Sequence, residues 1–292
     1  MQKVLVLGGT GMLGHKLVQV FNGTFDTYCT IRDGKAAFEL LGIVPRDRVI
    51  DGVSAEDFQT VERAIRIIEP DVVVNAIGII KQLPSSKDVV QTLTVNSILP
   101  HQVASLAGLL GFRFITLSTD CVFSGGNGNY SESDRPDSVD VYGLSKFLGE
   151  VHSPNSLTIR TSIIGRELGT AHGLIEWFLS QEGRVNGYSK AIFSGFPTIV
   201  LAELLAAIIR DFPRLEGLYH VSSDAISKFE LLNLVRERLK RDVLIDKDEE
   251  FVIDRSLDST RFREATGFSP LPWKEMVDRM FSDPTRYDEW NK

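Results

Sequence analysis

Short apolar runs alternate with longer amphipathic stretches through the first half of the chain. The run at Lys3–Leu7 is typical of a strand buried on both faces of a parallel sheet. Further strands are expected at about 26–32, 48–51, 72–75 and 113–118. Helices are expected between them, from the first glycines to about 21, at 55–68 and at 89–110. This alternation predicts an α/β fold with a Rossmann-type, doubly wound parallel sheet and right-handed crossovers.

A glycine-rich turn, GGTGMLG at 8–14, joins the first expected strand to the first expected helix. It holds both the G-x-G-x-x-G and the G-x-x-G-x-x-G spacing. Such glycines permit a tight turn and the close approach of a pyrophosphate, and the helix N-terminus offers free N–H groups to the anion. The turn predicts a dinucleotide site. The expected contacts are Gly8, Thr10, Gly11, Met12, Leu13 and Gly14.

The end of the second strand bears on which dinucleotide binds. An acidic residue there would hold the 2′-hydroxyl of NAD, whereas an arginine would suit the 2′-phosphate of NADP. Arg32 comes first, Lys35 is close by, and Asp33 lies between them. We therefore expect NADPH, with NADH also possible because of Asp33. Solvated loop charges are the alternative interpretation.

Small and polar residues follow the next strands at their carboxyl ends, where such sheets bind ligands. Asp51 could accept a hydrogen bond from the adenine amino group, or it could be a turn residue. The small residues after the fourth strand would let the cofactor ribose approach the backbone. The cofactor contacts expected at these ends are Asn75, Ala76, Ile77, Gly78 and Ser118.

Tyr142 and Lys146 are four residues apart, which places both side chains on one face of a helix. A phenol has a pKa of about 10, and a nearby ammonium lowers it, so that the tyrosine can exchange a proton with a carbonyl or alcohol oxygen. Thr119 can donate a second hydrogen bond to that oxygen. Tyr-x-x-x-Lys is common by chance, but the glycine turn makes chemistry the better interpretation. We predict Thr119, Tyr142 and Lys146 as catalytic residues, with Tyr142 and Lys146 also contacting the cofactor.

The regular alternation weakens after Arg160. Helices are expected at 171–182, 199–210 and 228–239, and a strand at 217–221, whereas 183–195 reads as loop-rich. We predict an NAD(P)-binding Rossmann domain at 1–160. Residues 161–292 are expected to form mainly a smaller substrate-binding lobe, interleaved with the first part in a single two-lobed unit.

Composition narrows the class of protein. The chain has 292 residues, 43% of them apolar, and a net charge of −7 without a basic block, which argues against nucleic-acid binding. Its two cysteines form neither a disulfide framework nor a zinc cluster. The N-terminal apolar run is too short for a signal peptide, and no apolar run reaches about 18 residues. We expect a cytoplasmic protein with no membrane span and no metal site, as a monomer or homodimer.

These motifs together resemble those of the extended short-chain dehydrogenase/reductases, and most closely the dTDP-4-dehydrorhamnose reductase group. The resemblance covers nearly the whole chain and implies NADPH-dependent reduction of a nucleotide-linked 4-keto-6-deoxyhexose in the biosynthesis of deoxysugar and polysaccharide precursors. The matching segments are STDCVFSG at 118–125, YGLSKFLGE at 142–150, RTS at 160–162, GFPT at 195–198 and RSLDS at 255–259.

The resemblance also implies roles. Tyr142 would be the proton donor, Lys146 would lower its pKa and bind the nicotinamide ribose, and Thr119 would orient the substrate carbonyl. Asn96 matches a structural or cofactor-side asparagine, with capping or packing as the alternative. Several residues in or near the expected cleft are candidate substrate contacts, although each could instead be a packed core residue or a solvated charge. The candidate substrate contacts are Lys81, Asp120, Cys121, Phe123, Trp177 and Lys190.

Cys121 departs from the group, which usually carries tyrosine after Thr-Asp. GDP-fucose synthase-like epimerase/reductases keep a catalytic cysteine there, and a thiolate could exchange a proton next to the keto group. Those enzymes pair it with a histidine that 163–167 does not offer, and His172 is the nearest candidate. We favour a small half-buried residue. No glutamate follows Asp120, which argues against a dehydratase.

Two alternative functions stay open. One is a UDP-4-keto-6-deoxy-amino-sugar reductase or an epimerase/reductase on the same fold. The other is a non-catalytic, cofactor-binding regulatory subunit, against which the intact set of Thr119, Tyr142 and Lys146 argues.

Overall fold

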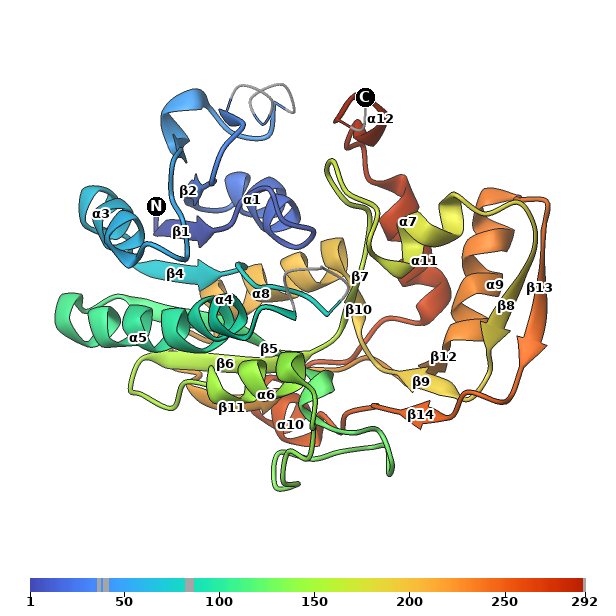
Figure 1. Cartoon of the computed structure of the whole chain (residues 1–292). Coiled ribbons are helices and arrows are strands. Elements are labelled where there is room, and N and C mark those ends of the chain that lie inside the picture. Colours follow the sequence, from blue (N-terminus) through green and yellow to red (C-terminus); the bar gives the residue numbers. More distant parts are fainter. Residues whose placement is uncertain (36–37, 39–41, 82–86, 291–292) are drawn as a thin grey trace.

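A central sheet of seven parallel strands organises the molecule (Figure 1). The computed structural model describes residues 1–35, 38, 42–81 and 87–290. The strand order is β11-β6-β5-β4-β1-β2-β3, so the chain winds outward from β1 in both directions. The predicted doubly wound α/β fold is confirmed. The strands are β1 (Lys3–Leu7), β2 (Asp26–Thr30), β3 (Val49–Ile50), β4 (Val72–Asn75), β5 (Arg113–Thr119), β6 (Ser156–Thr161) and β11 (Gly217–His220).

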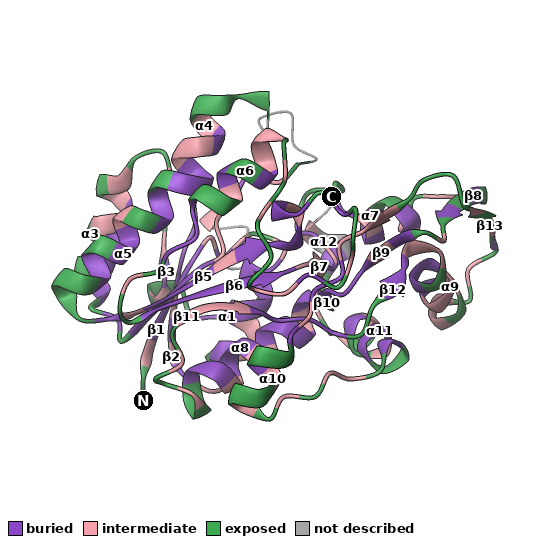
Figure 2. Ribbon diagram, turned by 90° about the horizontal axis from the view of Figure 1, so that it is seen from below, coloured by how far each residue is buried: buried purple, intermediate pink, exposed green. Residues whose placement is uncertain are grey.

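Helices cover both faces of this sheet, and β1 shows why its sequence is so apolar. Successive side chains of a strand point to opposite faces. Val4 and Val6 belong to the core beneath α1 and α8, whereas Leu5 and Leu7 belong to the core beneath α3 and α5. All four side chains are fully buried, as Figure 2 shows for the strands that run between the helix layers. These helices are α1 (Gly14–Asn22), α8 (Thr198–Asp211), α3 (Phe58–Ile68) and α5 (Leu99–Leu110).

The long helix expected at 89–110 is interrupted. It consists of α4 (Val89–Leu93), a π-helical turn at Thr94–Ile98 and then α5. Pro100 lies in the first turn of α5 and has no N–H to donate to the carbonyl of Asn96. Leu99 instead donates to Thr94, five residues back. The released carbonyl of Asn96 lies where a side chain at Gly149 would be, so Gly149 allows the chain after α6 to pack closely here. Helix α6 is Val141–Leu148.

The second half of the chain adds small sheets to one side of the molecule, and we call this part the added lobe (Figure 1). One pairs β8 (Gly183–Tyr188) with β13 (Val243–Asp248), another has the order β12-β9-β14, and β7 pairs with β10. The prediction that 183–195 is loop-rich was wrong. Pairing with β13, far away in sequence, overrides the weak local strand propensity of β8. The remaining short strands are β7 (Ile163–Ile164), β9 (Ala191–Phe193), β10 (Phe196–Pro197), β12 (Ile226–Ser227) and β14 (Ile253–Asp254).

The two halves are interleaved. Strand β11 and helix α8 come from the second half, yet β11 extends the central sheet and α8 packs against α1. None of the helices in the described segments has the length and apolar character needed to cross a membrane. Further helices and short 3-10 turns have bounds within the described residues. They are α7 (Leu174–Leu179), α9 (Lys228–Leu239), α10 (Thr260–Thr266), α11 (Trp273–Ser282) and α12 (Tyr287–Trp290), with the turns at Arg46–Arg48 and Asp120–Val122.

Candidate active site

The glycine turn closes tightly between β1 and α1. A Cβ atom on Gly14 would lie 1.9 Å from the carbonyl oxygen of Gly8, and Gly8 has a φ of +86°, which favours glycine. Within the described chain, the backbone amides of Thr10, Met12 and Leu13 donate to no acceptor. Free amides at a helix N-terminus suit an anion such as a pyrophosphate. The turn therefore fits the predicted dinucleotide. The amide of Gly11 is occupied, because it donates to the carbonyl of Gly8 at 3.1 Å.

The residues expected near the adenosine differ in how freely they can reach a ligand. Arg32 lies just beyond β2 with a side chain that is 76% exposed, and its Nε is 3.9 Å from a carboxylate oxygen of Asp33. Lys35 donates to the carbonyl of Val49 at 2.9 Å. Asp51 accepts from the amide of the following glycine at 2.8 Å, as a turn aspartate does. Arg32 is therefore the basic side chain here that is best placed to bind a 2′-phosphate.

Two asparagines hold the loop that follows β4. Asn75 accepts from the amide of Ile77 at 3.1 Å. Asn96, from the π-helical turn, accepts from the amide of Ile79 and donates to its carbonyl, both at 2.9 Å, and also donates to Ser145 on α6. Asn96 thus has the structural role that was one of its two expected roles. Ala76 and Gly78 lie in the same loop, at the carboxyl edge of the sheet.

The three predicted catalytic residues meet where β5 ends. Thr119 is the last residue of β5; its hydroxyl donates to Asp120 at 3.1 Å, and its interaction with Tyr142 lowers the pKa of the phenol. Tyr142 and Lys146 lie one turn apart on α6, which begins after Asp140, whose carboxylate accepts from the amide of Gly143 at 2.8 Å. The ammonium of Lys146 donates to a β5 carbonyl at 2.6 Å. Helix α6 therefore presents both side chains to the end of β5.

Burial shifts the pKa values of two of these three side chains. It raises the pKa of Tyr142 well above that of a free phenol, and nearby Cys121 adds to the rise, whereas Thr119 opposes it. Burial lowers the pKa of Lys146 to about 8, and Glu150 opposes that change. The expected fall in the pKa of Tyr142 is not seen in the protein alone, because burial raises this pKa; the ammonium of Lys146 is bonded to the carbonyl of Leu117.

A buried ion pair that sequence reasoning did not assign lies behind the trio. Glu150 accepts two hydrogen bonds from Arg160, at 2.7 and 2.8 Å, and a third from Ser118 at 2.7 Å. Arg160 also bonds to His220 at 3.1 Å, and His220 bonds to the carbonyl of Tyr130 at 2.8 Å. Burial lowers the pKa of His220 to about 4, so this ring is neutral, as expected for a core histidine. Ser118 therefore supports the site through Glu150.

Asp120 and Cys121 directly follow Thr119 in the chain, whereas the ring of Phe123 lies in the core. Burial raises the pKa of the Cys121 thiol to about 12, and Asp120 adds to the rise, so the thiol is protonated at neutral pH. Burial also raises the pKa of Asp120. Phe123 is fully buried and stacks on Tyr130 with 4.1 Å between ring centroids. It has no exposed surface with which to contact a substrate, so its ring supports the site from behind.

The other three candidate substrate residues are spread over the molecule. Lys81 bonds to Asp140 at 2.8 Å and so links the loop after β4 to the start of α6. Trp177 lies on α7 and is 39% exposed. Lys190 lies 3.6 Å from Glu249 and lines a hollow of about 340 Å³ on the added lobe. The structure does not bring these side chains together.

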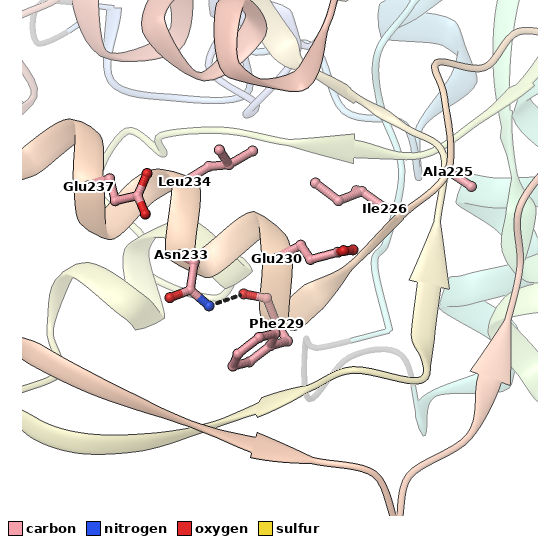
Figure 3. A pocket seen from close by; sticks show the side chains of 7 residues that line it. All are labelled: Ala225, Ile226, Phe229, Glu230, Asn233, Leu234 and Glu237. Carbon is pink, nitrogen blue, oxygen red and sulfur yellow. Dashed lines mark hydrogen bonds between the residues drawn. The ribbon is translucent and has the colours of Figure 1, made fainter.

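A larger hollow of about 510 Å³ lies along α9, and none of the three predicted catalytic residues lines it (Figure 3). Figure 3 shows Asn233 bonded to the carbonyl of Phe229 within its own helix. Over the described part of the chain, no three His, Cys, Asp or Glu side chains are grouped as metal ligands would be. The lining residues are Ala225, Ile226, Phe229, Glu230, Asn233, Leu234 and Glu237.

Comparison with known proteins agrees with this geometry. The family model described as the RmlD substrate binding domain matches residues 1–285. The chain belongs to this family. The predicted resemblance to the dTDP-4-dehydrorhamnose reductase group is thereby confirmed at the level of the family.

Relatives of this RmlD-family chain differ in how much of it they match. The spore coat polysaccharide biosynthesis protein SpsK of Bacillus subtilis (strain 168) is 29% identical over 295 residues, which cover 95% of this chain and 96% of SpsK. A dTDP-4-dehydrorhamnose reductase of Burkholderia thailandensis is 30% identical over 55% of this chain and 49% of its own length. The methionine adenosyltransferase 2 subunit beta of Danio rerio is 30% identical over 57% of this chain and 49% of its own length.

Solved structures share the fold over the full length of the RmlD-family chain. The dTDP-4-dehydrorhamnose reductase of Bacillus anthracis in complex with NADP has a TM-score of 0.79 and 21% identity, and covers 98% of this chain and 100% of its own. The Bordetella bronchiseptica enzyme WbmG in complex with NAD and UDP has a TM-score of 0.76 and 20% identity, and covers 99% of this chain and 94% of its own. At these identities, the likeness concerns the fold.

Proposed function

We propose that the protein is an oxidoreductase that uses NADPH to reduce the keto group of a nucleotide-linked 4-keto-6-deoxyhexose, dTDP-4-dehydrorhamnose or a close analogue. The observation that carries the proposal is the meeting of Thr119, Tyr142 and Lys146 at the edge of the sheet that also holds the glycine turn. The names of the dTDP-4-dehydrorhamnose reductase relatives and of SpsK support this substrate class and a place in polysaccharide biosynthesis.

The protonation states fit a reductase. Bound NADPH would supply the hydride to C4 of the sugar. The raised pKa keeps Tyr142 as a phenol at neutral pH, so it carries the proton that the forming alkoxide needs. Thr119 would donate a hydrogen bond to the same oxygen and so orient the carbonyl. One hydride and one proton convert the ketone to the alcohol.

Arg32 supports the preference for NADPH. Its exposed guanidinium at the end of β2 suits the 2′-phosphate, and solved structures of the fold contain NADP in one case and NAD in another. We therefore propose NADPH as the cofactor, with NADH as a weaker alternative that Asp33 would favour.

The alternatives make different demands on Cys121 and on turnover. An epimerase would need Cys121 to give up its proton, which a thiol with a pKa of about 12 resists, so we favour plain reduction. A UDP-4-keto-6-deoxy-amino-sugar reductase would use the same trio, so only a substrate panel separates it from the first proposal. The partial likeness to methionine adenosyltransferase 2 subunit beta supports a regulatory cofactor-binding subunit as the second candidate.

The test is loss of NADPH absorbance with a panel of dTDP- and UDP-linked 4-keto-6-deoxy sugars, with products identified by mass spectrometry. Tyr142→Phe should lower kcat at least about 100-fold, because it removes the proton donor. Tyr219→Phe on the edge strand β11 is the matched control and should retain activity. Undiminished turnover by Tyr142→Phe would remove Tyr142 from the mechanism, and cofactor binding without turnover on the whole panel would favour the regulatory subunit.

A further inference from the structure

We propose that Lys228 and Arg255 form the subsite that binds the diphosphate of the sugar nucleotide. The inference rests on the proposed function, because it names the part of the substrate that these two residues recognise. Neither side chain was predicted as a site residue from the sequence, although Arg255 begins the matching segment RSLDS at 255–259.

The three-stranded sheet of the lobe positions both residues (Figure 1). Lys228 directly follows β12, and Arg255 directly follows β14; both strands pair with β9 between them. The amide of Arg255 donates to the carbonyl of Ile192 on β9 at 3.1 Å, which fixes its backbone to this sheet. The antiparallel β12 and the parallel β14 thus place Lys228 and Arg255 on opposite sides of β9, so the lobe presents two cationic side chains from the strands that flank β9.

Arg255 reaches across to the catalytic loop. Its Nε donates to the carbonyl of Phe123 at 2.9 Å, and its Nη1 lies 3.6 Å from the sulfur of Cys121. The amide of Cys121 in turn donates to the hydroxyl of Thr119 at 3.1 Å. One end of the guanidinium is thus fixed beside the residue that would orient the substrate carbonyl.

Lys228 lies half-buried in the same neighbourhood. Burial lowers the pKa of its ammonium; the negative forms of Cys121 and Asp120 oppose this change, and the charge of Arg255 adds to it. No carboxylate in the described segments forms an ion pair with Lys228, and no hydrogen bond from its ammonium is seen there. A half-buried cation without a partner is costly unless a ligand compensates it.

The acidic side chains around this pair are engaged elsewhere. Asp137 accepts hydrogen bonds from the amide and the hydroxyl of Ser124 at 2.7 and 2.6 Å. Asp140 caps α6 and pairs with Lys81. Asp120 is buried, which raises its pKa, and it accepts a hydrogen bond from the hydroxyl of Thr119 at 3.1 Å. In the described part of the chain, none of these three carboxylates forms an ion pair with Lys228 or Arg255, so both cations stay open to an anion.

The position of the pair indicates which anion it binds. The cofactor pyrophosphate is expected at the turn after β1, whereas the pair lies beside the loop after β5, two strands away in the sheet. Two strand spacings amount to about 10 Å. A neutral sugar needs no cation, whereas the diphosphate that joins sugar to nucleoside carries the charge that Lys and Arg bind. The diphosphate of the substrate is therefore the occupant.

The test measures binding of dTDP, UDP and GDP to the NADP-saturated protein by calorimetry, which needs no turnover. Lys228→Gln should weaken binding of the preferred nucleoside diphosphate at least tenfold, Arg255→Gln should also weaken it, and Lys228→Arg should restore most of it. Lys274→Gln, which removes one exposed lysine on α11, is the matched control and should leave binding within twofold. Affinity for NADPH should stay within twofold in the Lys228 variants.

The outcomes separate this inference from the proposed function. Equal affinity of wild type and Lys228→Gln for every nucleoside diphosphate, or no binding by the wild type, would overturn the subsite even if the wild type reduces a keto sugar. Binding that depends on Lys228 without turnover on any sugar nucleotide would support the subsite and contradict the proposed reductase. Lys228 forms no bond within the described protein that its replacement would break, so loss of folding does not obscure the result.

Discussion

At the scale of single residues, Glu150 connects the end of α6 to the core. It neutralises Arg160, accepts from Ser118 on β5, and opposes the fall in the pKa of Lys146. We infer that Glu150 is a positioning residue, because it touches none of the reacting atoms and acts through Lys146 and through the end of β5.

Glu150→Gln should have two effects. It leaves Arg160 buried without its carboxylate, which costs about 3–5 kcal/mol of unfolding free energy. It also moves the pKa of Lys146 below about 8, because the carboxylate that favours the ammonium is gone. In the cofactor-free protein, reaction of Lys146 with an amine reagent should therefore set in at lower pH than in the wild type, as followed by mass spectrometry.

Glu203→Gln is the matched control, since Glu203 pairs with Arg279 at 2.7 Å on the surface. Exposed pairs of this kind contribute about 0–1 kcal/mol, so denaturant unfolding should hardly change. A Lys146 titration that is the same in Glu150→Gln and wild type would show that Glu150 does not tune the lysine.

The sequence predicted the arrangement of the candidate catalytic residues better than their electrostatics. Helical spacing predicted that Tyr142 and Lys146 share a face, and the structure places them one turn apart on α6. The direction of the pKa change of Tyr142 depends on burial and on Thr119 and Cys121, which only the tertiary structure brings close. Phe123 was predicted as a substrate contact, but its ring is buried against Tyr130. This stacking cannot be read from a local sequence pattern, so the sequence could not exclude Phe123.

At the scale of elements, the turn between β1 and α1 tolerates no side chain at Gly14. Gly14→Ala would place a Cβ 1.9 Å from the oxygen of Gly8, so α1 must move away from β1. We expect a loss of about 1–3 kcal/mol in unfolding free energy. We also expect at least tenfold weaker NADPH binding, measured by fluorescence titration.

Gly23→Ala at the other end of α1 is the matched control for Gly14→Ala. A Cβ on Gly23 meets nothing within 4 Å, and its φ of −82° suits alanine. It should leave stability unchanged or raise it by about 0.4–1 kcal/mol. Unchanged NADPH affinity in Gly14→Ala would contradict the assignment of this turn to the cofactor.

Elements set by local pattern were predictable, and elements set by distant partners were not. The Lys228–Leu239 helix was expected with the bounds that it has, because its signals are local: Ser227 caps its start together with Glu230, and its apolar residues recur at helical spacing. Strand β8 was missed because its partner β13 lies far along the chain. The break in the helix at 94–98 was missed because Pro100 in the first turn of a helix is usually tolerated.

At the scale of the whole molecule, the end of the chain returns to α1. Lys16 is only 1% exposed. Its ammonium pairs with Asp283 and also donates to Thr285 at 2.6 Å. His15, the preceding residue, bonds to Tyr287 at 3.0 Å. The helix behind the glycine turn is therefore held by residues that lie more than 260 positions away.

Asp283→Asn should destabilise the protein strongly. It leaves the buried ammonium of Lys16 without its carboxylate, a change that costs about 3–5 kcal/mol. Asp278→Asn removes a carboxylate from a more exposed pair, with Arg238 at 2.8 Å, and should cost at most about 1 kcal/mol. Denaturant unfolding compares the two. Equal stabilities of the two variants would show that the chain end does not hold α1.

The central claim is that a hydride passes from the nicotinamide to C4 of a nucleotide-linked sugar at this site. The most direct measurement offers the protein NADPH deuterated at the transferable position of C4 together with the keto sugar nucleotide that it turns over. Mass spectrometry and NMR should find one deuterium in the product, at C4 of the sugar. A product without deuterium at C4, or one labelled only at C3 or C5 when the reaction is run in heavy water, would contradict the account.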